Sequence, residues 1–103
     1  AAKQYGRAVV TPSNGTRSSY WSNSYSTETH TIRIRGKTGS APSSFSDGTS
    51  LGTASVTNNA TTAADITITD PNTYEHVWAI VETNPTFAGG TVLLAEIVFY
   101  EWR

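Results

Sequence analysis

The sequence contains no cysteine and no methionine. The absence of cysteine excludes a disulfide framework, a thiolate metal site and a cysteine nucleophile. The longest apolar run, residues 77–81, is far shorter than the roughly 20 residues that span a bilayer, so we expect no membrane insertion. Because position 1 is not Met, we expect the chain to be processed or to be part of a larger protein, and we favour the second.

Charge is also scarce. Charged residues make up 15% of the chain, against a usual share of about a quarter, and the formal net charge is -1 at pH 7. A chain without a basic field cannot neutralise a row of phosphates, so nucleic acid is not expected as a partner. Serine and threonine stand in place of the missing charge, which is typical of secreted, cell-surface and virion proteins. We therefore expect an extracellular or virion-surface location.

The one dense basic stretch contains Arg33, Arg35 and Lys37. Their alternate spacing places the three side chains together on one face of a strand. We interpret that face as solvated; the alternative is a patch for an anionic ligand.

Helical periodicity is absent, since no stretch of 11 or more residues carries apolar residues at three-and-four spacing. Alternating patterns instead predict strands at residues 8–10, 29–36, 51–56, 65–69, 74–82 and 91–102. With 103 residues there is room for one hydrophobic core, so we predict a single domain over residues 1–103. Its predicted fold is an all-β antiparallel sandwich of the jelly-roll type. Polar stretches at 11–26 and 37–50 predict long loops, where binding tends to occur.

Two of these strands have informative faces. Within 29–36, His30, Ile32 and Ile34 alternate with polar residues, which predicts one buried and one solvated face. Strand 74–82 carries apolar residues at both odd and even positions. That pattern is typical of a central strand, buried on both sides.

Three segments close the chain: Tyr-Glu-His-Val-Trp-Ala-Ile-Val at 74–81, Gly-Gly at 89–90 and Leu-Ala-Glu-Ile-Val-Phe-Tyr at 94–100. Together they resemble the closing half of galactose-binding-like modules of the discoidin, or F5/8 type C, family. Asn14-Gly15 and Trp21-Ser22 are similar to the family's early Asp-Gly and Trp-Ser pair, with Asn14 in place of the Asp. The resemblance implies a jelly roll that binds glycans or lipids through the loops at one end and often holds a structural calcium.

Residues 17–25 have a composition that packing does not dictate, with three large aromatic side chains among polar residues. Flat aromatic faces can hold sugar rings, and Arg17 and Asn23 can donate directional hydrogen bonds. Two interpretations of Trp21 stay open: a sugar platform, or a plug for one end of the core. The predicted ligand-binding residues are Arg17, Tyr20, Trp21, Asn23, Tyr25 and, from the second long loop, Asp47.

Candidate catalytic residues have simpler structural explanations. The possible bases are His30 and His76, which we interpret as half-buried structural residues, and no Gly-x-Ser-x-Gly elbow accompanies them. Glu96 lies within an apolar run, so we expect it to be partly buried and to accept hydrogen bonds from loop backbone. Glu75 and Glu82 flank one strand and are expected to point to water. We therefore predict that the protein is not an enzyme.

The single local hint of a calcium site is Asp47-Gly48-Thr49, and ordinary turn chemistry explains it equally well. We expect no cofactor, with a structural calcium left open. The predicted function is a non-catalytic carbohydrate-binding domain of a larger secreted or virion protein, with a glycan or cell-surface polysaccharide as partner. The alternative is a structural subunit, such as a viral decoration, fibre or filament protein, that packs against copies of itself through strand edges.

Overall fold

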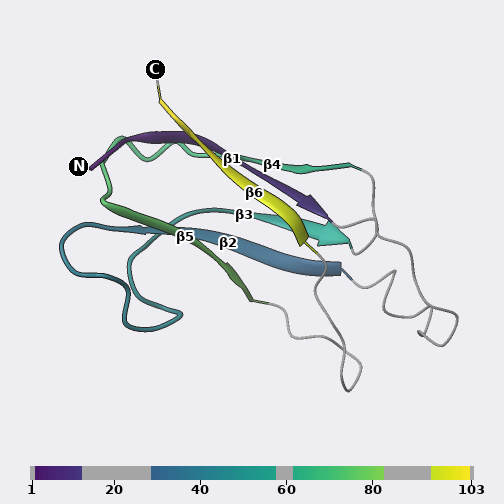
Figure 1. The fold of residues 1–103 in the computed structure, drawn as a ribbon, viewed down its shortest axis with the longest axis horizontal. Helices are drawn as coiled ribbons and strands as arrows, with labels where there is room; N and C mark the ends of the chain where they lie inside the picture. The colour runs from purple at the N-terminus through teal and green to yellow at the C-terminus, as the bar shows by residue number, and fades with distance from the viewer. Residues whose placement is uncertain (1, 13–28, 58–61, 83–93, 103) are drawn as a thin grey trace, which may run out of the picture.

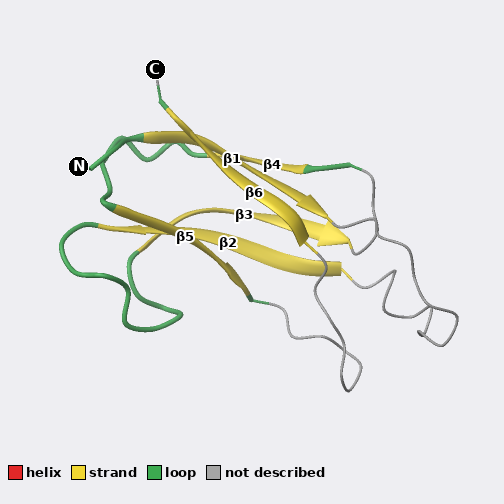
Figure 2. Ribbon diagram, viewed as in Figure 1, coloured by secondary structure: helices red, strands yellow, loops and turns green. Residues whose placement is uncertain are grey.

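The computed structural model describes residues 2–12, 29–57, 62–82 and 94–102. These residues form six β-strands and no helix, so the predicted all-β fold is confirmed (Figure 2). The strands are β1 (Tyr5–Pro12), β2 (Thr29–Lys37), β3 (Thr49–Thr57), β4 (Ala64–Thr67), β5 (His76–Val81) and β6 (Leu94–Glu101). Each of them overlaps one of the segments in which the alternating pattern predicts a strand.

The strands form two antiparallel three-stranded sheets, in the orders β4-β1-β6 and β3-β2-β5. The chain crosses repeatedly between them, so that β1 and β2 become the middle strands of the two described sheets (Figure 1). This is the arrangement of a β-sandwich, in which one face of each sheet packs inward and the other remains outside.

The core is centred on the two middle strands. Ala8 and Val10 of β1 have 0% exposure, and Ile32 and Ile34 of β2 have at most 1%. The alternation within 29–36 therefore predicts the inward face correctly. The remaining buried members of the core are Leu51, Val56, Ile66, Ile68 and Tyr74. Burial of one such large apolar side chain stabilises the fold by about 1.5–3 kcal/mol, so these residues dominate its stability.

Among the described residues, the expected central strand at 74–82 is not found. Within the described sheet β5 is an edge strand, hydrogen-bonded to β2 on one side. Its two apolar faces have different partners: Val77 and Ala79 pack against the core, whereas Trp78 and Ile80 meet loop residues outside the sandwich. A loop that covers the outer face of a sheet thus gives an edge strand the sequence pattern of a central one.

Three further expectations about burial need correction. Glu96 is exposed rather than partly buried, because it lies on the outward face of β6, next to the inward-packed Ile97. His30 is fully buried rather than half-buried, because it points into the core at the end of β2. The face that carries Arg33, Arg35 and Lys37 is half-buried rather than fully solvated. Arg33 contacts Glu82 and Ser50, whereas Arg35 and Lys37 contact the loop described next.

Candidate functional site

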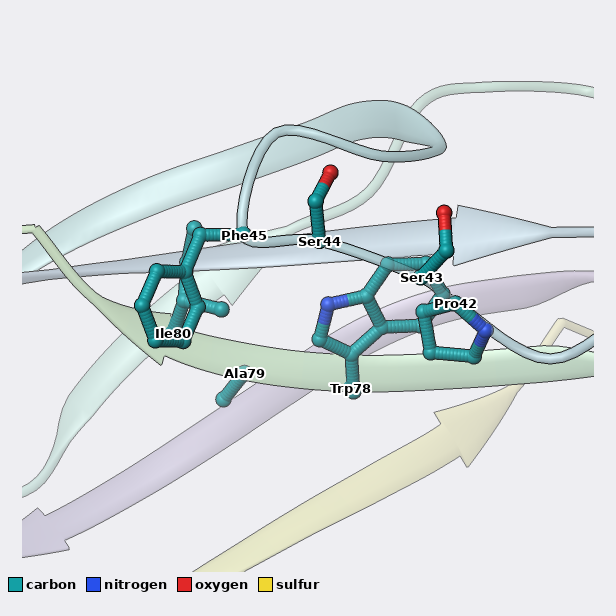
Figure 3. A pocket seen from close by; sticks show the side chains of 7 residues that line it. All are labelled: Pro42, Ser43, Ser44, Phe45, Trp78, Ala79 and Ile80. Atoms are coloured by element: carbon teal, nitrogen blue, oxygen red, sulfur yellow. The ribbon is translucent and has the colours of Figure 1, made fainter.

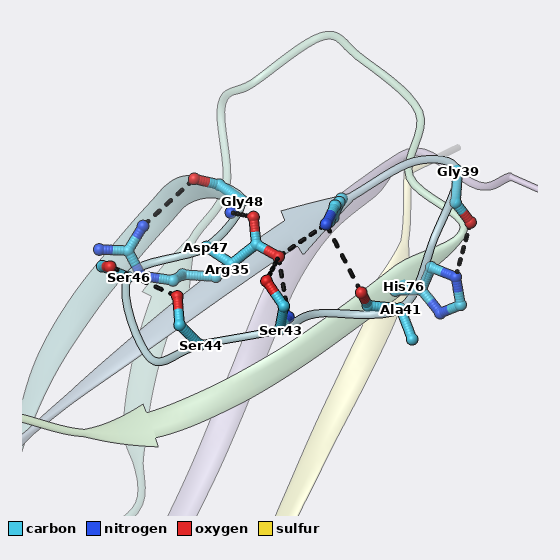
Figure 4. Close-up of polar contacts among 10 residues, drawn as sticks. Arg35, Gly39, Ala41, Ser43, Ser44, Ser46, Asp47, Gly48 and His76 are labelled. Atoms are coloured by element: carbon cyan, nitrogen blue, oxygen red, sulfur yellow. Dashed lines mark hydrogen bonds and ion pairs between the residues drawn. The ribbon is translucent and has the colours of Figure 1, made fainter.

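The loop from residue 38 to residue 48, between β2 and β3, is organised around one carboxylate (Figure 4). Asp47 Oδ2 accepts hydrogen bonds from Lys37 Nζ at 2.6 Å and from the backbone N–H of Ser43 at 2.9 Å. Its Oδ1 accepts from the N–H of Gly48 at 2.8 Å. The Lys37 ammonium, together with the Ser43 and Gly48 amides, holds the pKa of Asp47 well below its usual range. These bonds hold the backbone of residues 43–48 in a defined turn.

A second set of contacts fixes the other end of this loop. The N–H of Gly39 donates to Glu75 Oε1 at 2.9 Å, and the carbonyl oxygen of Gly39 lies 3.2 Å from His76 Nε2. The Thr38 hydroxyl donates to the carbonyl oxygen of Thr73 at 3.1 Å. Glu75 is exposed, as expected, yet it has a defined partner in the loop. These bonds tie the loop to the segment that leads into β5.

Gly48 brings the loop into contact with Trp78. Its φ of +77° lies in the left-handed region that favours glycine. A Cβ at this position would stand 2.7 Å from the carbonyl oxygen of Gly36 and 2.8 Å from Trp78 Cη2. Both distances are shorter than the van der Waals contact of a carbon atom allows. The edge of the indole is therefore held against the loop backbone, while the rest of the half-buried side chain faces outward.

Between this loop and β5 lies an open groove of about 570 Å³, which we call the β5 groove (Figure 3). It is lined by Pro42, Ser43, Ser44, Phe45, Trp78, Ala79 and Ile80. Phe45 is 84% exposed, more than any other large hydrophobic side chain that the structure describes. Leaving such a side chain in water forgoes about 1.5–3 kcal/mol of burial, and exposed apolar patches commonly mark interaction sites.

The β5 groove continues past Phe45 into a smaller hollow of about 320 Å³, lined by Arg35, Phe45, Ser46, Ile80, Val81 and Glu82. Glu82 Oε2 accepts a hydrogen bond from Arg33 Nε at 2.7 Å, and this contact lowers the pKa of the Glu82 carboxyl. The groove therefore joins an aromatic and aliphatic floor to a polar, charged end. Small-molecule sites commonly combine apolar linings with a few placed polar groups in this way.

The structure bears on one of the predicted ligand-binding residues. Arg17, Tyr20, Trp21, Asn23 and Tyr25 lie outside the described residues, so their role stays a prediction. Asp47 is described, and its carboxylate is occupied by bonds that shape the loop beside the groove. Within the described ranges no group of three or more His, Cys, Asp or Glu could hold a metal ion, and no helix is long and apolar enough to cross a membrane.

Phe45 and Trp78 are not among the site residues predicted from the sequence. Phe45 does carry a signal, since it is a large aromatic side chain in the polar stretch 37–50 and meets the criterion that selects 17–25. Trp78 carries no separate signal, because its position in an apolar strand suggests packing. Only the path of the loop brings the two residues to the same groove.

No family model, no curated protein and no solved structure matches this chain. The resemblance of residues 64–102 to galactose-binding-like modules stays a prediction from sequence motifs. What the β5 groove binds must therefore follow from the side chains that line it.

The contact between Gly48 and Trp78 predicts different costs for two glycine substitutions. Gly39 has a φ of +98° but nothing within 4 Å of the point where a Cβ would stand, whereas Gly48 has both a positive φ and the two close contacts. Both alanine variants incur backbone strain of about 1–2 kcal/mol. We expect Gly48→Ala to lower the free energy of unfolding further, by at least about 1 kcal/mol relative to Gly39→Ala. Urea denaturation followed by tryptophan fluorescence measures both; equal losses would show that the Gly48 contacts do not constrain the loop.

The lowered pKa of Asp47 predicts a pH dependence of stability. Its ionised form is favoured in the folded state, so its contribution is present above the ordinary pKa of 3.8 and is lost as pH falls below that value. Asp47→Asn should therefore be less stable than the parent chain at pH 7, and the difference should shrink progressively below about pH 4. Asp65→Asn, which removes an ion pair with about half of each side chain exposed, is the control and should change stability little. A difference that is constant from pH 7 to pH 2.5 contradicts the assignment.

Proposed function

We propose that this chain is a non-catalytic carbohydrate-binding domain and that the β5 groove is its binding surface. The observation that carries the proposal is the exposed Phe45, which lies beside Ile80 and Trp78 in an open groove (Figure 3). Flat apolar side chains can pack against the C–H faces of sugar rings. The hydroxyl of Ser44, in the same lining, can exchange hydrogen bonds with sugar hydroxyls, whereas that of Ser43 already donates to Asp47 Oδ2 at 3.2 Å.

The form of the groove favours part of a chain-like ligand over a small enclosed one. The lining runs from Pro42 past Phe45 to Glu82, bounded by the 38–48 loop on one side and by the edge strand β5 on the other. A polysaccharide can lie along such an open surface and continue beyond both ends. The proposed domain therefore recognises an internal segment of a glycan or cell-surface polysaccharide.

The absence of catalysis is part of the proposal. Glycoside hydrolysis ordinarily needs two carboxyl groups about 5 to 9.5 Å apart across the scissile bond. Among the described residues that line the groove, Glu82 is the one acidic side chain, and Arg33 already binds it. This arrangement supports binding without bond cleavage.

We also propose that the sandwich has jelly-roll connectivity and is displayed outside the cell or on a virion as part of a larger protein. The antiparallel pairing of the first and last strands and the repeated crossing between sheets support the jelly roll. The low charge of the chain supports the location. An experimental structure of the whole chain would test the connectivity through its complete strand order.

A specific observation favours a second candidate, a structural subunit that assembles with copies of itself. β3 is nine residues long and carries no charged residue and no proline, and in the described sheet it pairs only with β2. Natural edge strands are usually protected by lysine, proline or bulges, because an open edge recruits further strands. β3 has one such feature, a shift in register at Leu51 opposite Ile34 and Arg35, and neither of the other two. Sedimentation analysis distinguishes the two candidates, since a chain that is monomeric at high concentration and binds glycans is not a self-assembling subunit.

The glycan-binding proposal predicts a clear effect of Phe45→Ala. Removing the exposed ring should weaken glycan binding at least about tenfold, which corresponds to about 1.4 kcal/mol. Because the side chain is 84% exposed, the free energy of unfolding should change by no more than about 0.5 kcal/mol. A glycan array identifies a ligand, and titration calorimetry then measures the affinity.

Tyr100→Ala is the matched control, because Tyr100 is an aromatic residue of β6, in the other sheet, and is 45% exposed. We expect this variant to bind glycans as tightly as the parent chain. Equal binding by the Phe45 variant and the parent would exclude the β5 groove as the binding surface. A chain that binds no glycan on the array contradicts the function itself.

A further inference from the structure

Arg35 is the one lysine or arginine without a carboxylate partner in the part of the chain that the structure describes. The other four form ion pairs with acidic residues: Lys3–Glu101, Arg7–Asp65, Arg33–Glu82 and Lys37–Asp47. Arg35 instead donates from Nη1 to the carbonyl oxygen of Gly48, at a long 3.3 Å. The three basic residues of β2 therefore differ: Arg33 and Lys37 form ion pairs within the chain, whereas Arg35 forms none.

The guanidinium of Arg35 is also short of hydrogen-bond acceptors. Its Nε is buried and has no acceptor among the described residues. Its one hydrogen bond to another described residue is the long bond from Nη1 to Gly48. A buried donor left unpaired costs about 1–3 kcal/mol, more when it is charged. A neutral residue at position 35 would avoid this cost, so the arginine points to a requirement other than folding.

Arg35 lies in the hollow at the end of the β5 groove, together with Phe45 and Glu82. The charge of Arg35 helps to lower the pKa of Glu82, but Glu82 forms its ion pair with Arg33, at 2.7 Å, and not with Arg35. Arg33, Arg35 and Glu82 together bring two positive charges and one negative charge to this end. The hollow therefore has a net positive charge next to an exposed aromatic ring.

We propose that the β5 groove selects acidic glycans, with the anionic substituent of a sugar residue bound by Arg35 and the ring packed against Phe45. This inference rests on the proposed function and names the ligand class. A guanidinium presents paired N–H donors whose geometry matches a carboxylate, and the hydrogen bonds that they form are stronger when the acceptor is charged. A hollow of about 320 Å³ has room for one such group and part of its ring. A uronic acid and a sulfate ester offer the same anionic chemistry.

The inference is tested with the full chain on a glycan array of acidic and neutral oligosaccharides, followed by calorimetry with polymers. Polygalacturonate and its fully methyl-esterified form share ring and linkage and differ in charge, while dextran sulfate and dextran make the corresponding sulfate pair. We expect the acidic member of at least one pair to bind at least tenfold more tightly, and its affinity to fall as salt rises. The pair that discriminates identifies the anionic group. Binding confined to neutral glycans would overturn the inference and leave the proposed function intact.

Arg35→Gln should weaken binding of the acidic polymer at least tenfold more than it weakens binding of a neutral glycan. Arg7→Gln, on β1 in the other sheet, is the control and should retain the affinity of the parent chain. Arg35→Lys keeps the charge and should lose less affinity than Arg35→Gln, which separates charge from a general disturbance of folding. If Phe45→Ala abolishes binding while Arg35→Gln binds acidic glycans as tightly as the parent chain, glycans bind in the β5 groove but Arg35 does not bind their anionic group.

Discussion

The ion pair between Lys37 and Asp47 determines the position of the proposed site. Lys37 is the last residue of β2 and Asp47 stands two residues before β3, so their contact at 2.6 Å closes the long connection between two paired strands. The same carboxylate receives the backbone N–H groups of Ser43 and Gly48, which fixes the intervening backbone. Phe45 lies between these two anchors. Its exposure is consequently a property of a restrained loop, and a restrained aromatic ring loses less entropy when it binds a ligand.

β2 contributes to both stability and recognition through the alternation of its side chains. The inward residues Ile32 and Ile34 form the centre of the core. Of the outward residues, Arg35 lines the hollow at the end of the β5 groove, and Arg33 binds Glu82, which lines the same hollow. Because the strand has a rigid core on one face, the arginines on the other face are held in fixed positions. A binding site on a packed strand is more precisely arranged than one formed by loops alone.

Local sequence patterns predict the strands and their inward faces, because alternation is a property of a few neighbouring residues. The inward faces of Ile32, Ile34 and Ile66 follow from it directly. The groove does not follow, since it requires the 38–48 loop to pack against β5, about thirty residues further along the chain. For the same reason the contact of Trp78 with the loop, and the bonds by which Asp47 organises that loop, do not follow from the sequence.

The central claim is that glycans bind in the β5 groove, and an NMR titration of the isotope-labelled chain with the best-bound array glycan tests it most directly. The account predicts that the largest shift changes fall on the indole N–H of Trp78 and on the backbone amides of Phe45, Ser46 and Ile80, which line the groove. The amides of β1 and β4, in the other sheet, should change little. Shift changes confined to residues 17–25, with those of Phe45 and Trp78 unmoved, would contradict the account.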